Sequence, residues 1–247
     1  IAQWCSVVRR LDGFNRHVSE DLDLKSDLMI DNASNIKVGI ENVDVFLPNK
    51  NKDNLIKDCT IDLMKYQSLL IMGASGVGKS TLLRTLAGLW PYAKGNVYLP
   101  KEEEFLFLPQ RPYLPLGSLR QAISYPVVEE VISEKYSDEE IKEILIACKL
   151  ENLADKLDIV DDWSRILSLG EQQRIAFVRI LLYRPEFVFL DEATSALDED
   201  LEGNLYDMLK FHLPNTKIIS IAHRSSLIAK HQVILRLKEK GCWEIHE

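Results

Sequence analysis

The amino-acid sequence predicts an α/β fold with a mainly parallel sheet core and a helical insertion. Three observations predict it. Short apolar runs typical of buried strands alternate along the chain with segments of helical periodicity. A glycine-rich motif joins one such strand to the helix that follows it. Residues from about 112 to 165 show helical patterns and little strand, which indicates helices inserted between two strands of the sheet.

The composition is that of a globular protein, and it narrows the possible partners. The chain has 247 residues, of which 46% are hydrophobic and 28% charged, enough for one large domain or slightly more. With 30 basic and 38 acidic residues, the net charge of −8 argues against a general nucleic-acid or anionic-membrane binder. The longest apolar runs are far shorter than the roughly 20 residues that span a bilayer. Four scattered cysteines favour free thiols in a reducing compartment.

The first part of the chain is expected to precede the folded domain. Residues 1–24 carry apolar side chains at helical spacing and are predicted to form an arm, and the polar residues 25–35 are predicted to be a linker. Apolar and polar residues then alternate from 36 to 47, as in a half-buried strand. We therefore expect the folded domain to extend over residues 36–247.

The remaining elements follow from apolar runs and helix-capping signals. Ser137 and Glu140 form a capping box that opens a helix, a second helix is expected over 169–183, and a third carries the leucines between 197 and 209. A hairpin is predicted late in the chain, over 233–237 and 242–245. The predicted buried strands are 68–72, 105–108, 187–190 and 217–222.

A phosphate-binding loop is the strongest chemical signal. The segment from Gly73 to Thr81 fits the pattern G-x-x-x-x-G-K-[ST], and it lies between a predicted strand and a predicted helix. The glycines allow the backbone N–H groups to point at an anion, Lys79 supplies a charge for the β- and γ-phosphates, and Ser80 offers a hydroxyl to Mg²⁺. The candidate nucleotide-binding residues are Gly73, Ala74, Ser75, Gly76, Val77, Gly78, Lys79, Ser80 and Thr81.

Two carboxylates end the predicted strand 187–190. Parallel α/β sheets bind ligands at the carboxyl ends of their strands, so Asp191 and Glu192 are expected beside the phosphate loop. Asp191 is a candidate Mg²⁺ ligand, and Glu192 is a candidate for orienting or deprotonating an attacking water.

Further motifs resemble those of ATP-binding cassette (ABC) ATPases. The segment Leu167–Arg174 (LSLGEQQR) resembles the signature motif of that family and lies 21 positions before Asp191 when counted from Gly170. Ser195 and Asp198 lie in a segment similar to the D-loop. Gln110 resembles the glutamine of the Q-loop, and His223 resembles the switch histidine.

The resemblance implies a P-loop NTPase of ABC type, with an antiparallel β subdomain and a helical subdomain over about 112–183. It implies ATP and Mg²⁺ as cofactors, and a head-to-tail homodimer in which each ATP lies between one chain's phosphate loop and its partner's signature motif. The implied catalytic residues are Glu192, His223 and Gln110. The implied metal ligands are Ser80, Gln110 and Asp191. The implied contacts to the partner's ATP are Ser168, Leu169, Gly170 and Glu171.

This sequence departs from the family pattern at two places. The commonest signature is L-S-G-G-Q, and here Leu169 replaces the first glycine and Glu171 the glutamine. Many members stack an aromatic residue on adenine about 25 positions before the phosphate loop. The aligned position here is Leu47, next to Phe46, and these two residues are the candidate adenine contacts.

The amino-acid sequences of residues 108–120 and of the signature motif resemble those of bacterial half-transporters related to subfamily D, of the SbmA/BacA-like permease–ATPase type. That likeness implies a membrane domain on the same polypeptide, for which residues 1–24 would be the lead-in. It also implies a place on the cytoplasmic face of the bacterial inner membrane and a role in powering transport, with the transported substrate open.

Two other functions fit parts of the sequence. A soluble ABC ATPase acting on nucleic acid or ribosomes usually carries long coiled coils, a second cassette or basic patches, and this sequence has none of them. A P-loop kinase acting on a small molecule would leave Leu167–Arg174 unexplained.

Overall fold

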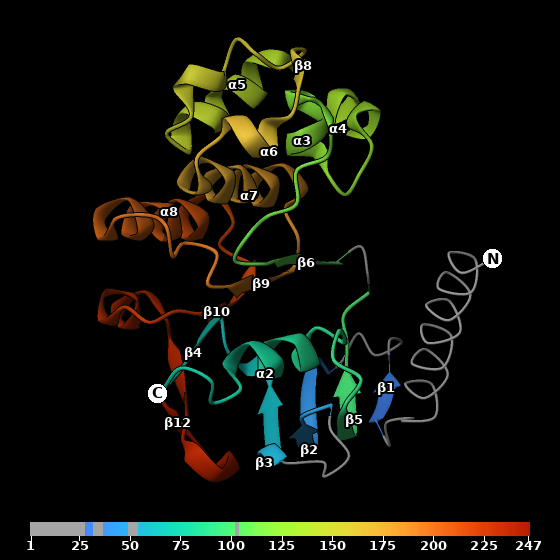
Figure 1. Cartoon of the computed structure of the whole chain (residues 1–247), viewed down its shortest axis with the longest axis vertical. Helices are drawn as coiled ribbons and strands as arrows, with labels where there is room; N and C mark the ends of the chain where they lie inside the picture. Colours follow the sequence, from blue (N-terminus) through green and yellow to red (C-terminus); the bar gives the residue numbers. More distant parts are fainter. Residues whose placement is uncertain (1–27, 32–36, 49–53, 102–103) are drawn as a thin grey trace, which may run out of the picture.

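The structure, a computed structural model, describes residues 28–31, 37–48, 54–101 and 104–247, and Figure 1 shows their arrangement. A six-stranded sheet lies between two cores. On one side are two long helices and a region of short helices, and on the other are one helix and a four-stranded sheet. The predicted α/β class is confirmed.

The six-stranded sheet supplies the parallel core. Its strands are parallel except the last, β12, which pairs antiparallel with β11. The four predicted buried strands all belong to this sheet, and so does the late hairpin. In spatial order the strands are β12 (Trp243–His246), β11 (Val233–Leu237), β4 (Ser68–Gly73), β10 (Lys217–Ile221), β9 (Phe187–Asp191) and β6 (Phe105–Leu108).

Burial on both faces explains why these strands read as unbroken apolar runs. In β9, Val188 and Leu190 face the core shared with the long helices, whereas Phe187 and Phe189 face the core shared with the four-stranded sheet. Successive side chains of a strand point to opposite faces, so a strand between two cores needs apolar residues at every position. All five residues of β9 are buried.

The four-stranded sheet is the antiparallel subdomain that the family resemblance implied. β2 pairs antiparallel with both β3 and β5, and β1 adds a parallel edge strand beside β5. The helix α2 (Lys79–Leu86) packs against this sheet through Leu82, Leu83 and Leu86. The strands are β1 (Leu28–Asp31), β2 (Gly39–Phe46), β3 (Asn54–Asp62) and β5 (Ala93–Tyr98).

The prediction of a linker over residues 25–35 was wrong in part, because Leu28–Asp31 forms β1. Three apolar residues in a polar stretch give too short a signal for a strand, and hydrogen bonding to β5 decides the outcome. Met29 and Ile30 of this edge strand are exposed. The predicted arm, residues 1–24, lies outside the described residues.

Residues 117–166 form a helical region between β6 and the long helix α7 (Leu169–Tyr183), as expected (Figure 1). Ser137 caps α5 in the predicted capping box with Glu140. The elements of this region are β7 (Gly117–Ser118), α3 (Leu119–Ser124), α4 (Glu129–Lys135), α5 (Asp138–Ala147), η3 (Glu151–Leu153), β8 (Val160–Asp161) and α6 (Trp163–Ile166).

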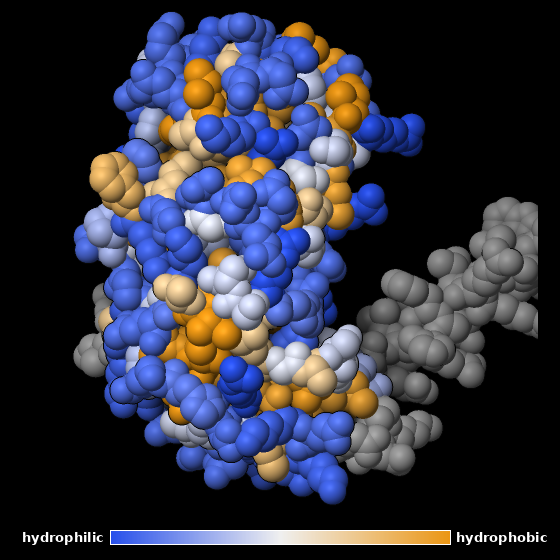
Figure 2. Space-filling model, turned by 90° about the vertical axis from the view of Figure 1, so that its left-hand side faces the viewer, coloured by the Kyte–Doolittle hydropathy of each residue, from blue (hydrophilic) through white to orange (hydrophobic). Residues whose placement is uncertain are grey.

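Helix α8 (Glu199–His212) lies beside α7 and covers the same face of the sheet (Figure 1). No helix among the described residues has the length and apolar character needed to cross a membrane. Hydrophilic side chains cover most of the face shown in Figure 2, with apolar side chains in separate patches.

The two-sided burial of β9 gives a stability prediction. Phe189→Ala removes a fully buried ring and should lower the free energy of unfolding by about 3–5 kcal/mol, measured by urea denaturation. Phe211 on α8 is 81% exposed, so the same substitution there should change it by about 0.5 kcal/mol or less. Equal losses in the two variants would contradict the buried position of β9.

Candidate functional site

The carboxyl ends of four parallel strands bring the candidate residues together. Leu108 of β6 pairs with Leu190 of β9, and Ile221 of β10 pairs with Asp191. Gln110 and His223 therefore each lie two residues beyond a position in register with the end of β9. β4 joins the same edge through β10, and the phosphate loop follows β4 directly.

The phosphate loop has a backbone that only glycine adopts readily. Gly76 and Gly78 have φ values of 78° and 105°, in the left-handed region. At Gly73, a Cβ atom would lie 2.6 Å from the carbonyl oxygen of Leu237, so a side chain cannot fit. Such a curled loop turns successive N–H groups toward one point and makes an anion-binding concavity in front of α2.

Lys79 places its ammonium inside this loop. The side chain is buried, and Nζ donates to the carbonyl oxygens of Gly73 at 3.0 Å and Ala74 at 2.9 Å. Burial lowers the pKa of Lys79 from its ordinary value, and the nearby carboxylates of Glu192 and Asp191 oppose that shift. A partly desolvated cation held by two neutral carbonyls is well placed to pair with phosphate oxygens.

Ser80 and Asp191 meet at the start of α2. The Ser80 hydroxyl donates to Asp191 Oδ1 at 2.7 Å, and Arg84, one turn later on α2, lies 3.3 Å from Oδ2. A hydroxyl and a carboxylate are oxygen ligands of the kind Mg²⁺ prefers, so this pair fits that ion. The described residues contain no group of three or more His, Cys, Asp or Glu side chains able to hold a metal. The remaining ligands would then come from substrate phosphates and water.

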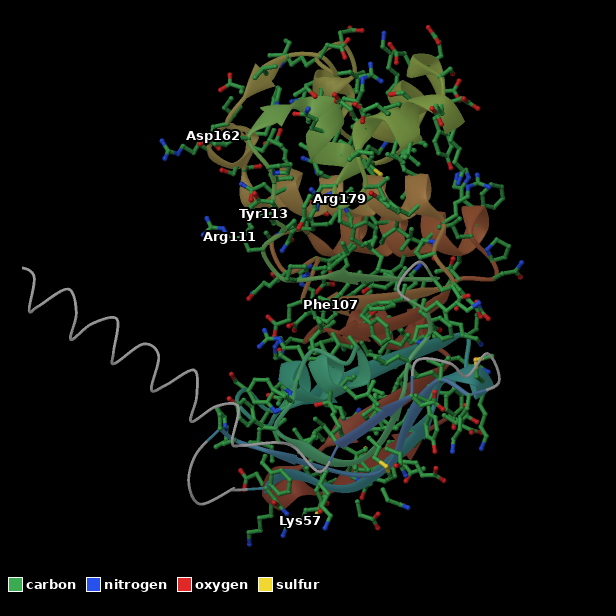
Figure 3. All side chains as sticks on the ribbon, turned by 90° about the vertical axis from the view of Figure 1, so that its right-hand side faces the viewer. Lys57, Phe107, Arg111, Tyr113, Asp162 and Arg179 are labelled. Atoms are coloured by element: carbon green, nitrogen blue, oxygen red, sulfur yellow. The ribbon has the colours of Figure 1, made fainter. Side chains whose placement is uncertain are left out.

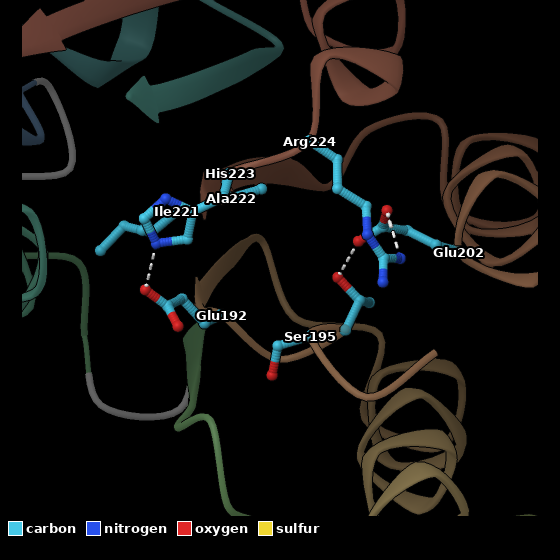
Figure 4. Close-up of a pocket in the computed structure, with 8 residues that line it drawn as sticks. Glu192, Ser195, Glu202, Ile221, Ala222, His223 and Arg224 are labelled. Carbon is cyan, nitrogen blue, oxygen red and sulfur yellow. Dashed lines mark hydrogen bonds and ion pairs between the residues drawn. The ribbon is translucent and has the colours of Figure 1, made fainter. Parts of the chain in front are cut away.

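Glu192 is hydrogen-bonded by both of the other candidate catalytic residues. Its Oε1 lies 2.8 Å from His223 Nε2 (Figure 4). Its Oε2 accepts from Gln110 Nε2 at 3.1 Å. Glu192 itself has a φ of 51°, an uncommon conformation for a residue with a side chain. Of the predicted metal ligands, Gln110 thus contacts Glu192 rather than the Ser80–Asp191 pair.

Helix α7 holds the segment after β6 by two side chains that the sequence did not single out. Gln173 is fully buried; its Nε2 donates to the Gln110 carbonyl oxygen at 2.9 Å, and its Oε1 accepts from the Ala196 N–H at 2.9 Å. Arg179 Nη2 donates to the Tyr113 carbonyl oxygen at 2.8 Å, and Figure 3 shows Tyr113 beside α7. Burial lowers the pKa of Arg179 to about 10. The Q-loop segment is therefore attached to α7 through its backbone.

The signature segment forms the N-terminal end of α7. Ser168 caps the helix; its hydroxyl donates to Glu171 Oε2 at 2.7 Å, and its backbone N–H bonds the same oxygen at 2.9 Å. In the part of the chain that the structure describes, no hydrogen bond or ion pair joins 168–171 to the phosphate loop. Asp198 caps α8 by accepting from the Leu201 N–H. The start of α7 is thus capped within the chain by Ser168 and Glu171.

A cavity of about 260 Å³ lies beside the phosphate loop, between residues 74–77, the start of β3 and the turn 238–241. Of the two candidate adenine contacts, Leu47 is 40% exposed, and the carbonyl oxygen of Phe46 accepts from Trp90 Nε1. Neither is among the described residues that line the cavity. Their role with adenine stays a prediction.

Comparison with known proteins shows which proteins this chain is similar to. The ABC transporter family model matches residues 56–195, which include the phosphate loop, the signature segment and Glu192. An uncharacterized ABC transporter ATP-binding protein of Haemophilus influenzae is 46% identical over 87% of this chain and 36% of its own length. The human lysosomal cobalamin transporter ABCD4 is 39% identical over 83% of this chain and 35% of its own length.

A solved structure shares the fold. A bacterial Atm1-family ABC exporter with ATP bound matches with a TM-score of 0.66 and 24% identity, over 83% of this chain and 37% of that one. The chain spans about a third of the length of these curated relatives. The resemblance to ABC ATPases is confirmed, and the finer likeness to SbmA/BacA-like proteins stays a prediction.

The position of Lys79 gives a binding prediction. Lys79→Ala removes a charged donor from the loop, which is worth about 1.5–3 kcal/mol, and should weaken Mg·ATP binding at least about 10-fold by calorimetry. Lys65→Ala, at an exposed lysine outside the loop, is the matched control and should bind normally. Unchanged affinity in the Lys79 variant would refute the assignment of the loop.

Proposed function

This chain belongs to the ABC transporter family, and from that premise we propose that it binds and hydrolyses ATP to power transport across a membrane. One observation carries the proposal. At a single edge of the sheet, Lys79 lies in the phosphate loop, Ser80 bonds Asp191, and Glu192 is bonded by Gln110 and His223. Phosphate-binding groups and a candidate general base for an attacking water thus lie side by side.

The binding step uses charge and backbone donors. The N–H groups of the loop and of the α2 N-terminus donate to the β- and γ-phosphate oxygens, and Lys79 neutralises part of the phosphate charge. Mg²⁺, held by Ser80 and Asp191, would supply further positive charge to the phosphate oxygens. Arg84 keeps Asp191 oriented toward Ser80. The protein carries a net charge of −8, so these local donors rather than its overall field must hold the anion.

The chemical step uses Glu192 as the base. Water attacks the γ-phosphorus, the bond from that phosphorus to the β–γ bridging oxygen breaks, and Glu192 takes the water proton, giving ADP and phosphate. His223 lies 2.8 Å from Glu192 and would donate to a γ-phosphate oxygen when ATP is bound. Gln110 bonds the other carboxylate oxygen and helps to orient the water.

The signature segment supports a dimer. A helix N-terminus favours anions, and Ser168 and Glu171 cap the N-terminus of α7, while the phosphate loop would bind its anion from one side. A second copy, packed head to tail, would place residues 168–171 against the partner's triphosphate. Glu171 is held in the capping box with Ser168, which also lowers the pKa of its carboxyl against the effect of its partial burial.

The relatives support a role in transport. Several are named as transporters, and the two described above are about two and a half times as long as this chain, which leaves room for a membrane domain in such proteins. We propose that the parent protein is a half-transporter whose ATPase domain starts with β1 and works on the cytoplasmic side of a membrane. The relatives and the acidic charge do not favour the alternative, a soluble ATPase that acts on nucleic acid or ribosomes.

Glu192→Gln should separate binding from turnover. A general base contributes about 10²–10⁴-fold, so ATPase activity should fall at least about 100-fold while ATP binding persists. The trapped nucleotide should stabilise the dimer, seen as a doubled mass in sedimentation with Mg·ATP. Glu186→Gln, at an exposed residue just before β9, should behave as wild type. A monomer at saturating Mg·ATP would count against the shared site.

Hydrolysis should depend on protein concentration. If each active site needs two chains, the rate rises faster than linearly with concentration until the dimer is saturated. Steady-state assays at saturating Mg·ATP across a hundred-fold concentration series check this. Strict proportionality over the whole range, with a monomeric mass in the same buffer, would show that one chain suffices.

A further inference from the structure

A buried carboxylate lies close to the candidate catalytic residues and takes no part in the proposed reaction. Glu202, in the first turn of α8, is only 2% exposed. An ionised carboxylate is costly to bury unless charged or hydrogen-bonding groups surround it. Its two oxygens contact two different loops, each of which carries a candidate catalytic residue (Figure 4).

The first loop is the one that follows β9. The Thr194 hydroxyl, itself buried, donates to Glu202 Oε1. Thr194 stands two residues after Glu192. The second loop follows β10, and there Arg224 Nη1 donates to Glu202 Oε2 at 3.2 Å. Arg224 directly follows His223. One side chain on α8 therefore ties together the loops of the base and of the switch histidine.

Beyond the register of β9 with β10 and the hydrogen bond from Gln110 to Glu192, few contacts fix the separation of the two catalytic side chains. The His223 side chain is 51% exposed, and among the described residues its hydrogen bond is the one to Glu192. Glu192 has the left-handed φ of 51°, and its N–H reaches the Ile221 carbonyl oxygen at 3.3 Å, a long hydrogen bond. Backbone held in such a sparsely populated conformation needs the surrounding structure to maintain it.

A cavity of about 200 Å³ separates the loops at this point. It is lined by Glu192, Thr194, Ser195, Glu202 and residues 221–224, so side-chain packing does not fill the space between the two loops. Glu202 bridges one side of this cavity, and the Glu192–His223 contact closes another (Figure 4). The hydrogen bonds from Thr194 and Arg224 to Glu202 therefore hold the two loops together where side-chain packing does not.

We propose that Glu202 is a positioning residue for ATP hydrolysis, which sets the distance between Glu192 and His223 by holding Thr194 and Arg224. Its hydrogen bonds go to Thr194 and Arg224, neither of which is assigned to the nucleotide site. The inference rests on the proposed ATPase function and extends it to a residue outside the nucleotide site. Its removal should therefore slow the chemical step while nucleotide binding through the phosphate loop is maintained.

The test compares Glu202→Gln with Glu199→Gln, an exposed position in the same turn of α8. Misplacement by about 1 Å costs up to roughly 100-fold in rate, so Glu202→Gln should lower kcat at least about 10-fold with KM for ATP changed less than about 2-fold. Glu199→Gln should match wild type. Both are assayed well below their melting temperatures, so that unfolded protein does not contribute.

A second set of variants keeps the proposal falsifiable if Glu202→Gln folds poorly. Thr194→Val removes one of the two bonds and should give a smaller loss of kcat. Arg224→Lys keeps a cation and should retain more activity than Arg224→Ala. The double variant Glu202→Gln/Arg224→Ala should be no slower than the worse single variant, because both act through one bridge.

The outcomes separate the two proposals. Wild-type protein without ATPase activity would overturn the proposed function, and this inference with it. Active wild type together with a Glu202→Gln kcat equal to that of Glu199→Gln would overturn the positioning role alone. A Glu202→Gln variant with normal kcat and only a lower melting temperature would show that Glu202 stabilises the fold without positioning the site.

Discussion

The parallel register of β9 with its two neighbours is the constraint on which the site depends. β9 hydrogen-bonds β6 on one side and β10 on the other, and the three strands end at nearly the same level. The residues that follow them, Gln110, Glu192 and His223, therefore reach one point although they are far apart in the sequence. The backbone hydrogen bonds of buried strands are rigid, which suits groups that must meet within hydrogen-bond distance.

At this edge of the six-stranded sheet, the local positions of individual charged groups matter more than the net charge of the protein. The protein is acidic overall, and two carboxylates stand next to the loop that receives an anion. Each carboxylate has its own hydrogen-bonding partners: Asp191 is bonded by Ser80 and the charged Arg84, and Glu192 by Gln110 and His223. Lys79 is kept inside the loop by two carbonyl oxygens. Each charged group at this edge thus has its own local partners, which hold it in a fixed position.

Sequence patterns predicted the parts that are local or buried on both faces. The phosphate loop is a contiguous motif, and β4, β6, β9 and β10 are unbroken apolar runs, so both could be read directly. β3 and β5 were missed because the four-stranded sheet has register shifts and half-exposed polar positions that break the alternation. The roles of Gln173, Arg84 and Glu202 depend on partners more than 20 residues away or on another element, and no pattern in one sequence reveals such pairs.

The attachment of the Q-loop segment to α7 has a consequence for how the chain can change in evolution. The chain leaves the core after Tyr113 to form the helical region and returns at the start of α7. Gln173 and Arg179 of α7 hold the segment before the helical region by bonding the carbonyl oxygens of Gln110 and Tyr113. Insertions or deletions within residues 117–166 can therefore alter its shape without moving Gln110. A single inserted residue in β9 would instead exchange the two faces of the strand and displace Glu192. Length variation among relatives should therefore concentrate in the helical region.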